Sequence, residues 1–126
     1  MAEPNADRGR KAQRIKALRR GRFSEYLAAL SLVLRGYRIL AMRYRVKAGE
    51  IDIIARKGDL VSFVEVKARA TSADSVFAVG GSTQSRIRNA SLYWLQTQKD
   101  AGRLSWSYDI VAVRPWRWPE HFRDAF

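Results

Sequence analysis

The stretch GEIDIIARKGDLVSFVEVKAR, residues 49–69, decides the fold of this chain of 126 residues. Residues 50–55 and residues 60–69 are rich in β-branched and aliphatic side chains, which is typical of strands. Between them, Lys57-Gly58-Asp59 supplies turn residues. We therefore predict an antiparallel hairpin.

This hairpin places Asp52 and Glu65 on one face of the sheet. If residues 58–59 form a two-residue type II′ turn with glycine first, Asp52 lies directly opposite Glu65, with Cβ atoms about 4.5–5.5 Å apart. If residues 57–58 form the turn instead, the two acids become diagonal neighbours at about 7–8 Å. A three-residue loop would separate them, so only the two-residue turns keep the acids together.

Two adjacent carboxylates need a cation. Their repulsion raises their pKa values unless a positive charge neutralises the pair. Lys67 shares the face of Glu65, as Glu50 shares that of Asp52, and a divalent metal would neutralise the pair fully. Oxygen donors with no cysteine and no nearby histidine favour Mg²⁺ or Mn²⁺ over zinc. A solvated strand face is the alternative, but charges inside apolar strands are expensive without a partner.

Further elements are predicted on both sides of the hairpin. Apolar residues recur with helical spacing from residue 23 to residue 34, and Gly36 is a natural stop. We expect this helix to be buried on more than one side, its main face being Phe23, Tyr26, Leu27, Leu30, Val33 and Leu34. Residues 37–45 and 106–113 are predicted strands. Residues 82–98 are a predicted helix with Ser82 as N-cap and a buried face of Ile87, Ala90, Ser91, Trp94 and Leu95.

The order αβββαβ predicts an α/β fold, a small mixed β-sheet flanked by helices. Residues 1–20 are expected to form a basic, flexible arm, residues 21–114 the folded domain, and residues 115–126 an aromatic tail. His121, the only histidine, lies in that tail. A catalytic Ser-His-Asp arrangement therefore has little support.

Charge points to a polyanionic partner. Lys and Arg number 24 against 12 Asp and Glu, a net charge of +12. Residues 1–22 alone hold eight basic residues and two acids. Binding to an anionic membrane is disfavoured because residues 8–22 lack large apolar anchors. The absence of cysteine excludes disulfides and thiolate metal sites and fits a cytoplasmic location. No apolar run approaches the ~20 residues of a membrane span, so we expect a soluble protein.

The blocks Gly49-Glu50-Ile51-Asp52-Ile53-Ile54-Ala55 and Phe63-Val64-Glu65-Val66-Lys67-Ala68-Arg69 resemble the signature of the YraN-like family of small bacterial predicted endonucleases. That family is grouped with the PD-(D/E)xK, restriction-endonuclease-like superfamily, distantly akin to Holliday junction resolvases. The resemblance covers about residues 21–113. It departs from the family pattern at Ser24, where the family has glycine, and at residues 83–85, where the family has a lysine.

The resemblance implies a restriction-endonuclease-like core and a role for each matching residue. Asp52 and Glu65 would hold Mg²⁺ or Mn²⁺, and the carbonyl of Val66 would supply another ligand. Lys67 would position or polarise the attacking water. Glu25 matches a position where the superfamily often adds an acid, although a first-turn acid that favours the helix dipole explains it equally well.

These observations favour a metal-dependent nuclease acting on DNA, with branched DNA one candidate substrate. The alternative is a non-catalytic nucleic-acid-binding module that keeps the fold and the basic surface. Backbone contacts to the polyanion are expected from basic side chains, which carry no sequence information. They are Arg20, Arg22, Arg35, Arg38, Arg43, Arg45, Lys47, Arg69, Arg86 and Arg88. For the tryptophans, core packing or a homodimer contact is favoured over stacking on unpaired bases.

Overall fold

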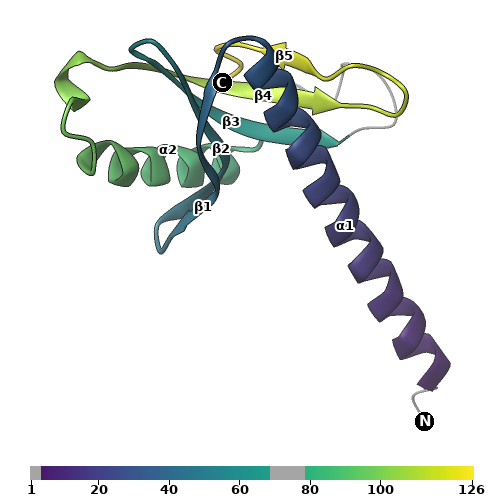
Figure 1. The fold of residues 1–126 in the computed structure, drawn as a ribbon. Helices are drawn as coiled ribbons and strands as arrows, with labels where there is room; N and C mark the ends of the chain where they lie inside the picture. The colour runs from purple at the N-terminus through teal and green to yellow at the C-terminus, as the bar shows by residue number, and fades with distance from the viewer. Residues whose placement is uncertain (1–3, 69–78) are drawn as a thin grey trace.

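A computed structural model describes residues 4–68 and 79–126, except for the side chains of residues 4–8 and 13–20. Within these residues, five strands form one sheet in the order β1-β2-β3-β4-β5, and two long helices pack against it (Figure 1). Only β3 and β4 pair in parallel. The elements are α1 (Pro4–Leu34), β1 (Arg38–Val46), β2 (Gly49–Lys57), β3 (Leu60–Ala68), α2 (Gly81–Gln96), a 3-10 turn (Ala101–Arg103), β4 (Ser105–Val113) and β5 (Glu120–Phe122). The predicted mixed sheet flanked by helices is confirmed, and it is compatible with a restriction-endonuclease-like core.

The β2–β3 hairpin has the register predicted for a turn at residues 58–59. Lys57 pairs with Leu60 and Ile53 with Val64. In this turn only Gly58 has a positive φ, 62°. A positive φ confined to the first central residue is the type II′ pattern.

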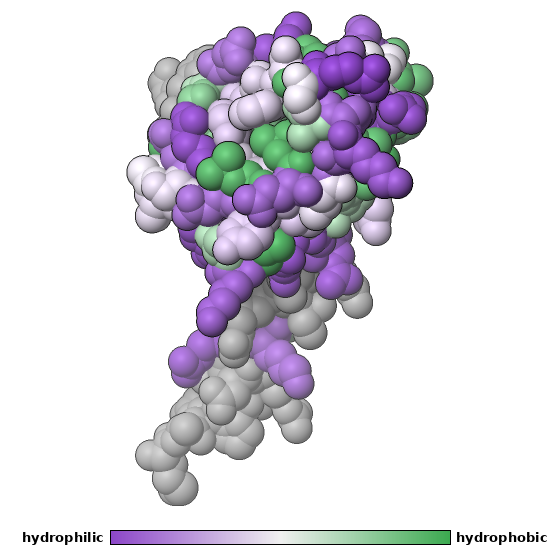
Figure 2. Space-filling view, turned by 90° about the vertical axis from the view of Figure 1, so that its left-hand side faces the viewer, coloured by the Kyte–Doolittle hydropathy of each residue, from purple (hydrophilic) through white to green (hydrophobic). Residues whose placement is uncertain are grey.

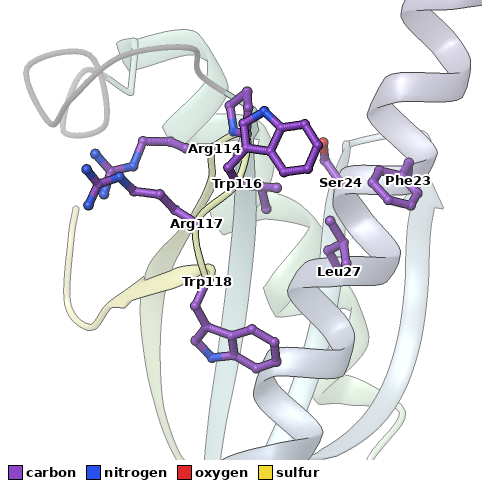
Figure 3. Close-up of a pocket in the computed structure, with 9 residues that line it drawn as sticks. Phe23, Ser24, Leu27, Arg114, Trp116, Arg117 and Trp118 are labelled. Carbon is purple, nitrogen blue, oxygen red and sulfur yellow. The ribbon is translucent and has the colours of Figure 1, made fainter.

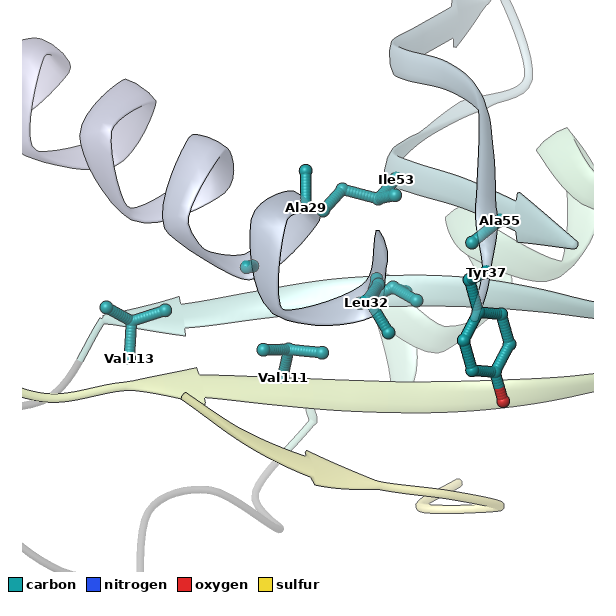
Figure 4. Close-up of a cluster of buried hydrophobic side chains, with 9 residues drawn as sticks. Ala29, Leu32, Tyr37, Ile53, Ala55, Val111 and Val113 are labelled. Atoms are coloured by element: carbon teal, nitrogen blue, oxygen red, sulfur yellow. The ribbon is translucent and has the colours of Figure 1, made fainter. Parts of the chain in front are cut away.

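Alternation along the strands sends neighbouring side chains to opposite faces of the sheet. Ile53 and Val64 pack in the cluster beneath α1, whereas Ile54 and Phe63 pack beneath α2. Figure 4 shows Leu32 of α1 among the strand side chains of the first cluster. The sheet is therefore a shared middle layer with one helix on each face.

The buried face of α2 is the predicted one, Ile87, Ala90, Ser91, Trp94 and Leu95. The predicted N-cap is wrong. The helix begins at Gly81, with the extended residue Gly80 as N-cap and no side-chain hydrogen bond. Ser82 lies two residues after the N-cap, because the backbone already becomes helical at Gly81.

The prediction for the buried face of α1 is wrong. Small residues and one leucine face the sheet: Ser24, Ala28, Ala29, Ser31 and Leu32. Of the predicted face, Phe23, Tyr26, Leu30, Val33 and Leu34 are exposed and only Leu27 is partly buried. Close approach to the strands favours the stripe of small side chains over the stripe of large ones. The helix is buried on one side only.

The N-terminal boundary of α1 also differs from the prediction. The helix begins at Pro4, so the predicted arm is helical, and Figure 1 shows this part extending away from the sheet. Residues 10–20 are mostly Arg, Lys, Gln and Ala, which are good helix formers but lack the apolar periodicity that predicts the helix from residue 23 onward. The stop at Gly36 is confirmed by its φ of 95°. Among the described residues, no helix is long and apolar enough to cross a membrane.

Part of the aromatic tail joins the sheet as β5, a strand that the sequence pattern does not predict. Val111 of β4 pairs with His121. Beneath this pair, the fully buried Asp109 accepts a hydrogen bond from the hydroxyl of Ser62 and lies 2.7 Å from Nε2 of His121. Burial alone would raise the pKa of Asp109, but the hydrogen bonds from His121 and Ser62 outweigh it and keep the pKa below its ordinary value. His121 therefore has a structural role in attaching the tail.

The backbone of α2 approaches the start of β2 at Gly49. A Cβ atom at this position would lie 1.9 Å from the carbonyl oxygen of Arg86. Real Cβ atoms do not come so close to a backbone atom, so only glycine allows the helix to lie where it does.

We predict that Gly49→Ala forces α2 away from the sheet and lowers the free energy of unfolding by about 1–3 kcal/mol or more. Gly102→Ala is the matched control, because a Cβ atom there has nothing within 4 Å. Urea denaturation of both variants measures the difference. Equal stability of the two variants would show that the contact is not a constraint.

Candidate functional site

Asp52 of β2 and Glu65 of β3 come together at the end of the hairpin away from the turn. The Oδ2 atom of Asp52 accepts a hydrogen bond of 2.8 Å from the backbone N–H of Val66. The carboxyl groups of Asp52 and Glu65 are also close enough to hydrogen-bond each other. The structure thus places these two residues side by side, as the two-residue turn predicts.

Burial raises the pKa values of both acids. Burial is the larger cause for Glu65 and the charge of Asp52 the second, and together they raise the pKa of Glu65 to about 7. Burial also raises the pKa of Asp52, against the opposing effect of the Val66 N–H. The ammonium of Lys67 lowers the pKa of Glu65, which places its charge within range of the pair. Near neutral pH the pair therefore retains a proton when no other cation compensates it.

Glu25 of α1 and Arg43 of β1 lie near the acid pair. Nε of Arg43 donates a hydrogen bond of 2.6 Å to Oε2 of Glu25. The charge of Glu25 contributes to the raised pKa of Asp52. Arg43 has a φ of 52°, which is uncommon for a residue other than glycine and is often found at functional sites. The structure therefore brings Glu25 near the acid pair, but Glu25 forms an ion pair with Arg43.

A cavity of about 160 Å³ opens beside the two acids. The first turns of α2 form one wall, with Thr83 and Arg86, and the hairpin strands form the other. Its lining consists of Glu50, Asp52, Glu65, Thr83, Arg86 and Ile87. Because the contact at Gly49 holds α2 in place, it also sets the width of this cavity.

The donor set suits a hard divalent cation. Among the described residues, no group of three or more His, Asp or Glu could hold a metal, so the protein supplies two carboxylates here. Mg²⁺ is usually bound through one or two carboxylates, with waters and substrate phosphates completing its coordination. The raised pKa values indicate a pair that lacks a compensating charge, and both donors are oxygens. Asp52 and Glu65 therefore fit Mg²⁺ or Mn²⁺.

The predicted phosphate-binding residues lie in different surroundings. Arg86 lines the cavity beside the acids, and Arg22 and Arg43 line a second cavity with Glu25. Arg45 forms an exposed ion pair with Glu50 at 3.2 Å. Others lie elsewhere: Lys47 is exposed in the β1–β2 turn, Arg38 is exposed on β1, and the guanidinium of Arg88 lies 4.5 Å from the ring centre of Tyr108. Figure 2 shows hydrophilic side chains surrounding small apolar patches on one face.

Three of these residues are not seen near either cavity. Arg35 donates a hydrogen bond of 2.9 Å to the carbonyl of Pro119, so its side chain holds the tail rather than a phosphate. The side chain of Arg20 and the whole of Arg69 lie outside the described residues.

Sequence reasoning missed two features of the site. The pairing of Arg43 with Glu25 joins residues from different elements, and no local pattern indicates it. In the sequence Thr83 marks only a departure from the family pattern, yet it lines the acid cavity. A small polar residue there leaves the cavity open where a lysine would extend into it.

We predict that the metal-free protein loses stability as the pH rises from about 4.5 to about 7. Between the ordinary pKa of 4.5 and the folded value of about 7, Glu65 binds its proton more tightly in the folded state. Glu65→Gln removes this titration, so its stability relative to the wild type should increase by up to about 3 kcal/mol across this range.

Urea denaturation in EDTA at both ends of the range measures this difference. Glu50→Gln is the control, because this side chain lines the same cavity but is 48% exposed. A pH-independent difference between Glu65→Gln and the wild type would show that the pair holds no proton.

Comparison with known proteins supports the family expected from the two strand motifs. A model of the uncharacterised protein family UPF0102 matches residues 24–113. The chain is 63% identical over 114 residues to the UPF0102 protein of Rhizobium meliloti strain 1021, covering 90% of this chain and 93% of that protein. It is 63% identical over 121 residues to the UPF0102 protein of Rhizobium leguminosarum bv. trifolii strain WSM2304, covering 96% of this chain and 99% of that protein. The chain therefore belongs to the uncharacterised protein family UPF0102.

Proposed function

We propose that the protein is a metal-dependent endonuclease that hydrolyses phosphodiester bonds in DNA, branched DNA being one candidate substrate. The observation that carries this proposal is the half-buried pair of Asp52 and Glu65 beside an open cavity, with the charge of Lys67 within range. Proteins place perturbed carboxylates in clefts where chemistry needs them, because fold stability alone disfavours them. The arrangement agrees with the PD-(D/E)xK pattern that the two strand motifs resemble.

Hydrolysis of a phosphodiester joins a water oxygen to phosphorus, breaks one phosphorus–oxygen bond and protonates the leaving oxygen. Mg²⁺ or Mn²⁺, held by Asp52 and Glu65 with the carbonyl of Val66 as a further donor, would stabilise the developing charge and make water more nucleophilic. Lys67 supplies a fixed positive charge for the transition state. Arg86 supplies a cation on the opposite wall to hold the phosphate.

The distribution of charge supports a nucleic-acid substrate. The chain has a net charge of +12, and eight of its basic residues lie within residues 8–22. The backbone of α1 carries these residues away from the sheet, so they extend the surface over which a long polyanion can bind (Figure 1). A small anionic substrate would not need such a surface.

The test is cleavage of labelled branched, duplex and single-stranded DNA with Mg²⁺, Mn²⁺ or EDTA. Lys67→Met keeps most of the apolar stem but removes the charge. Its cleavage rate should fall by roughly 10²-fold or more, with little change in DNA or metal affinity, because a preorganised charge acts mainly on the transition state. Asp52→Asn should lose both cleavage and calorimetric Mn²⁺ binding.

A wild type that is inert on every DNA form with both metals would contradict the nuclease proposal. It would favour the non-catalytic nucleic-acid-binding module. If Lys67→Met instead lowers stability and metal affinity while the wild type cleaves, Lys67 is a counter-ion of the acid pair.

A second prediction concerns the basic half of α1. Deleting residues 2–20 should weaken DNA binding and flatten its salt dependence by roughly one unit of log–log slope per lost phosphate contact. The melting temperature should change little, because this part of the helix extends beyond the sheet (Figure 1). A full-length variant with Arg14, Lys16, Arg19 and Arg20 changed to Gln separates charge from helix length. Unchanged salt dependence in both variants would exclude the helix from the DNA-binding surface.

A further inference from the structure

A groove of about 560 Å³ lies between α1 and the segment that joins β4 to β5. We call it the aromatic groove; it is lined by Phe23, Ser24, Leu27 and residues 113–118. In Figure 3, the rings of Trp116 and Trp118 lie on the side of the segment nearer α1. Trp116 is fully exposed, and Trp118 and Phe23 are 56% and 64% exposed. Three large aromatic side chains thus remain in solvent within one groove.

Trp116 occupies a backbone position that disfavours tryptophan. Pro115 and Trp116 are the central residues of a turn closed by a 3.4 Å hydrogen bond from the N–H of Arg117 to the carbonyl of Arg114. Trp116 has a φ of 61°. With proline first and a positive φ second, this is the type II pattern, in which the second position calls for glycine or asparagine. Because the indole is exposed, its burial offsets none of the strain of this backbone conformation. A strained and exposed tryptophan indicates that the ring binds a ligand.

The charges around the groove favour a polyanion over a second copy of the chain. The exposed Arg117 and Arg22, which lies one residue before Phe23, form no ion pair among the described residues, whereas Arg114 pairs with Glu120. Two copies of a chain that carries +12 repel each other, while a nucleic acid is attracted. Exposed aromatic rings beside arginines are the combination by which proteins hold single strands, the rings stacking on bases and the cations following the phosphates.

We propose that the aromatic groove binds unpaired bases of a single-stranded nucleic-acid segment, which stack on Trp116 and Trp118 while Arg117 and the basic half of α1 contact phosphates. Ser24 lines the groove and the next residue, Glu25, lines the cavity that contains Arg43, so the groove and this second cavity meet on the same turn of α1. The charge of Glu25 in turn acts on Asp52 of the acid pair. The inference rests on the proposed function and deepens it by adding a site for an unpaired segment of the nucleic acid.

The experiment measures binding without cleavage. Fluorescence anisotropy in EDTA compares a labelled oligothymidylate with an abasic strand of the same length, which keeps the phosphates and lacks the bases. Trp116→Gly suits the turn, so its melting temperature should equal or exceed that of the wild type. It should nevertheless bind oligothymidylate at least about tenfold more weakly, as the loss of one stacking ring does. Trp116→Phe should retain most of the affinity.

Trp106→Ala is the matched control, since this tryptophan is 43% exposed at the opposite end of β4 and should leave binding unchanged. The abasic strand should bind the wild type more weakly and be insensitive to Trp116→Gly. Equal binding of the wild type and Trp116→Gly to oligothymidylate would overturn the inference. It would also be overturned if sedimentation showed that Trp116→Gly dissociates a dimer. Neither readout depends on cleavage, so an inactive wild type would overturn the proposed function and leave this inference standing.

Discussion

The two-residue turn at Gly58 and Asp59 sets the register on which the rest of the structure depends. A slip of one residue between β2 and β3 would send every side chain of the moved strand to the other face of the sheet. Ile53 and Val64 would then leave the core beneath α1, and Glu65 would no longer lie beside Asp52. The positive φ of Gly58, which glycine adopts without cost, thus links core packing to the assembly of the acid pair.

The acid pair works against the stability of the isolated fold. Burial raises the pKa values of both carboxylates, the charge of Asp52 raises that of Glu65 further, and the nearby Lys67 offsets only part of this effect on Glu65. The surrounding backbone nevertheless holds them rigidly, since the N–H of Val66 orients Asp52 and the contact at Gly49 holds the wall formed by α2. Strong positioning of an electrostatically unfavourable pair is what a cation-binding catalytic centre requires.

One face of the helix α1 packs in the core, and its other faces lie at the surface. Its stripe of small residues lets it pack closely on the sheet, which leaves Phe23 and Tyr26 outside. One turn of this helix contributes Ser24 to the aromatic groove and Glu25 to the cavity beside Arg43. The same element thus joins the core, the Glu25–Arg43 cavity, the aromatic groove and the basic extension.

Local information in the sequence was sufficient for the hairpin, the buried face of α2 and the family, and for a shared face of Asp52 and Glu65 with either two-residue turn; the structure decided for the turn at residues 58–59. Each depends on alternation, helical spacing or turn chemistry within a short stretch. Tertiary structure alone decided which face of α1 is buried, that the tail pairs as β5, that Arg43 engages Glu25, and that α2 touches β2 at Gly49. These depend on contacts between distant segments, where shape and close approach outweigh side-chain hydrophobicity. A periodic apolar pattern shows that a helix has a face, but only the surface it meets determines which face is buried.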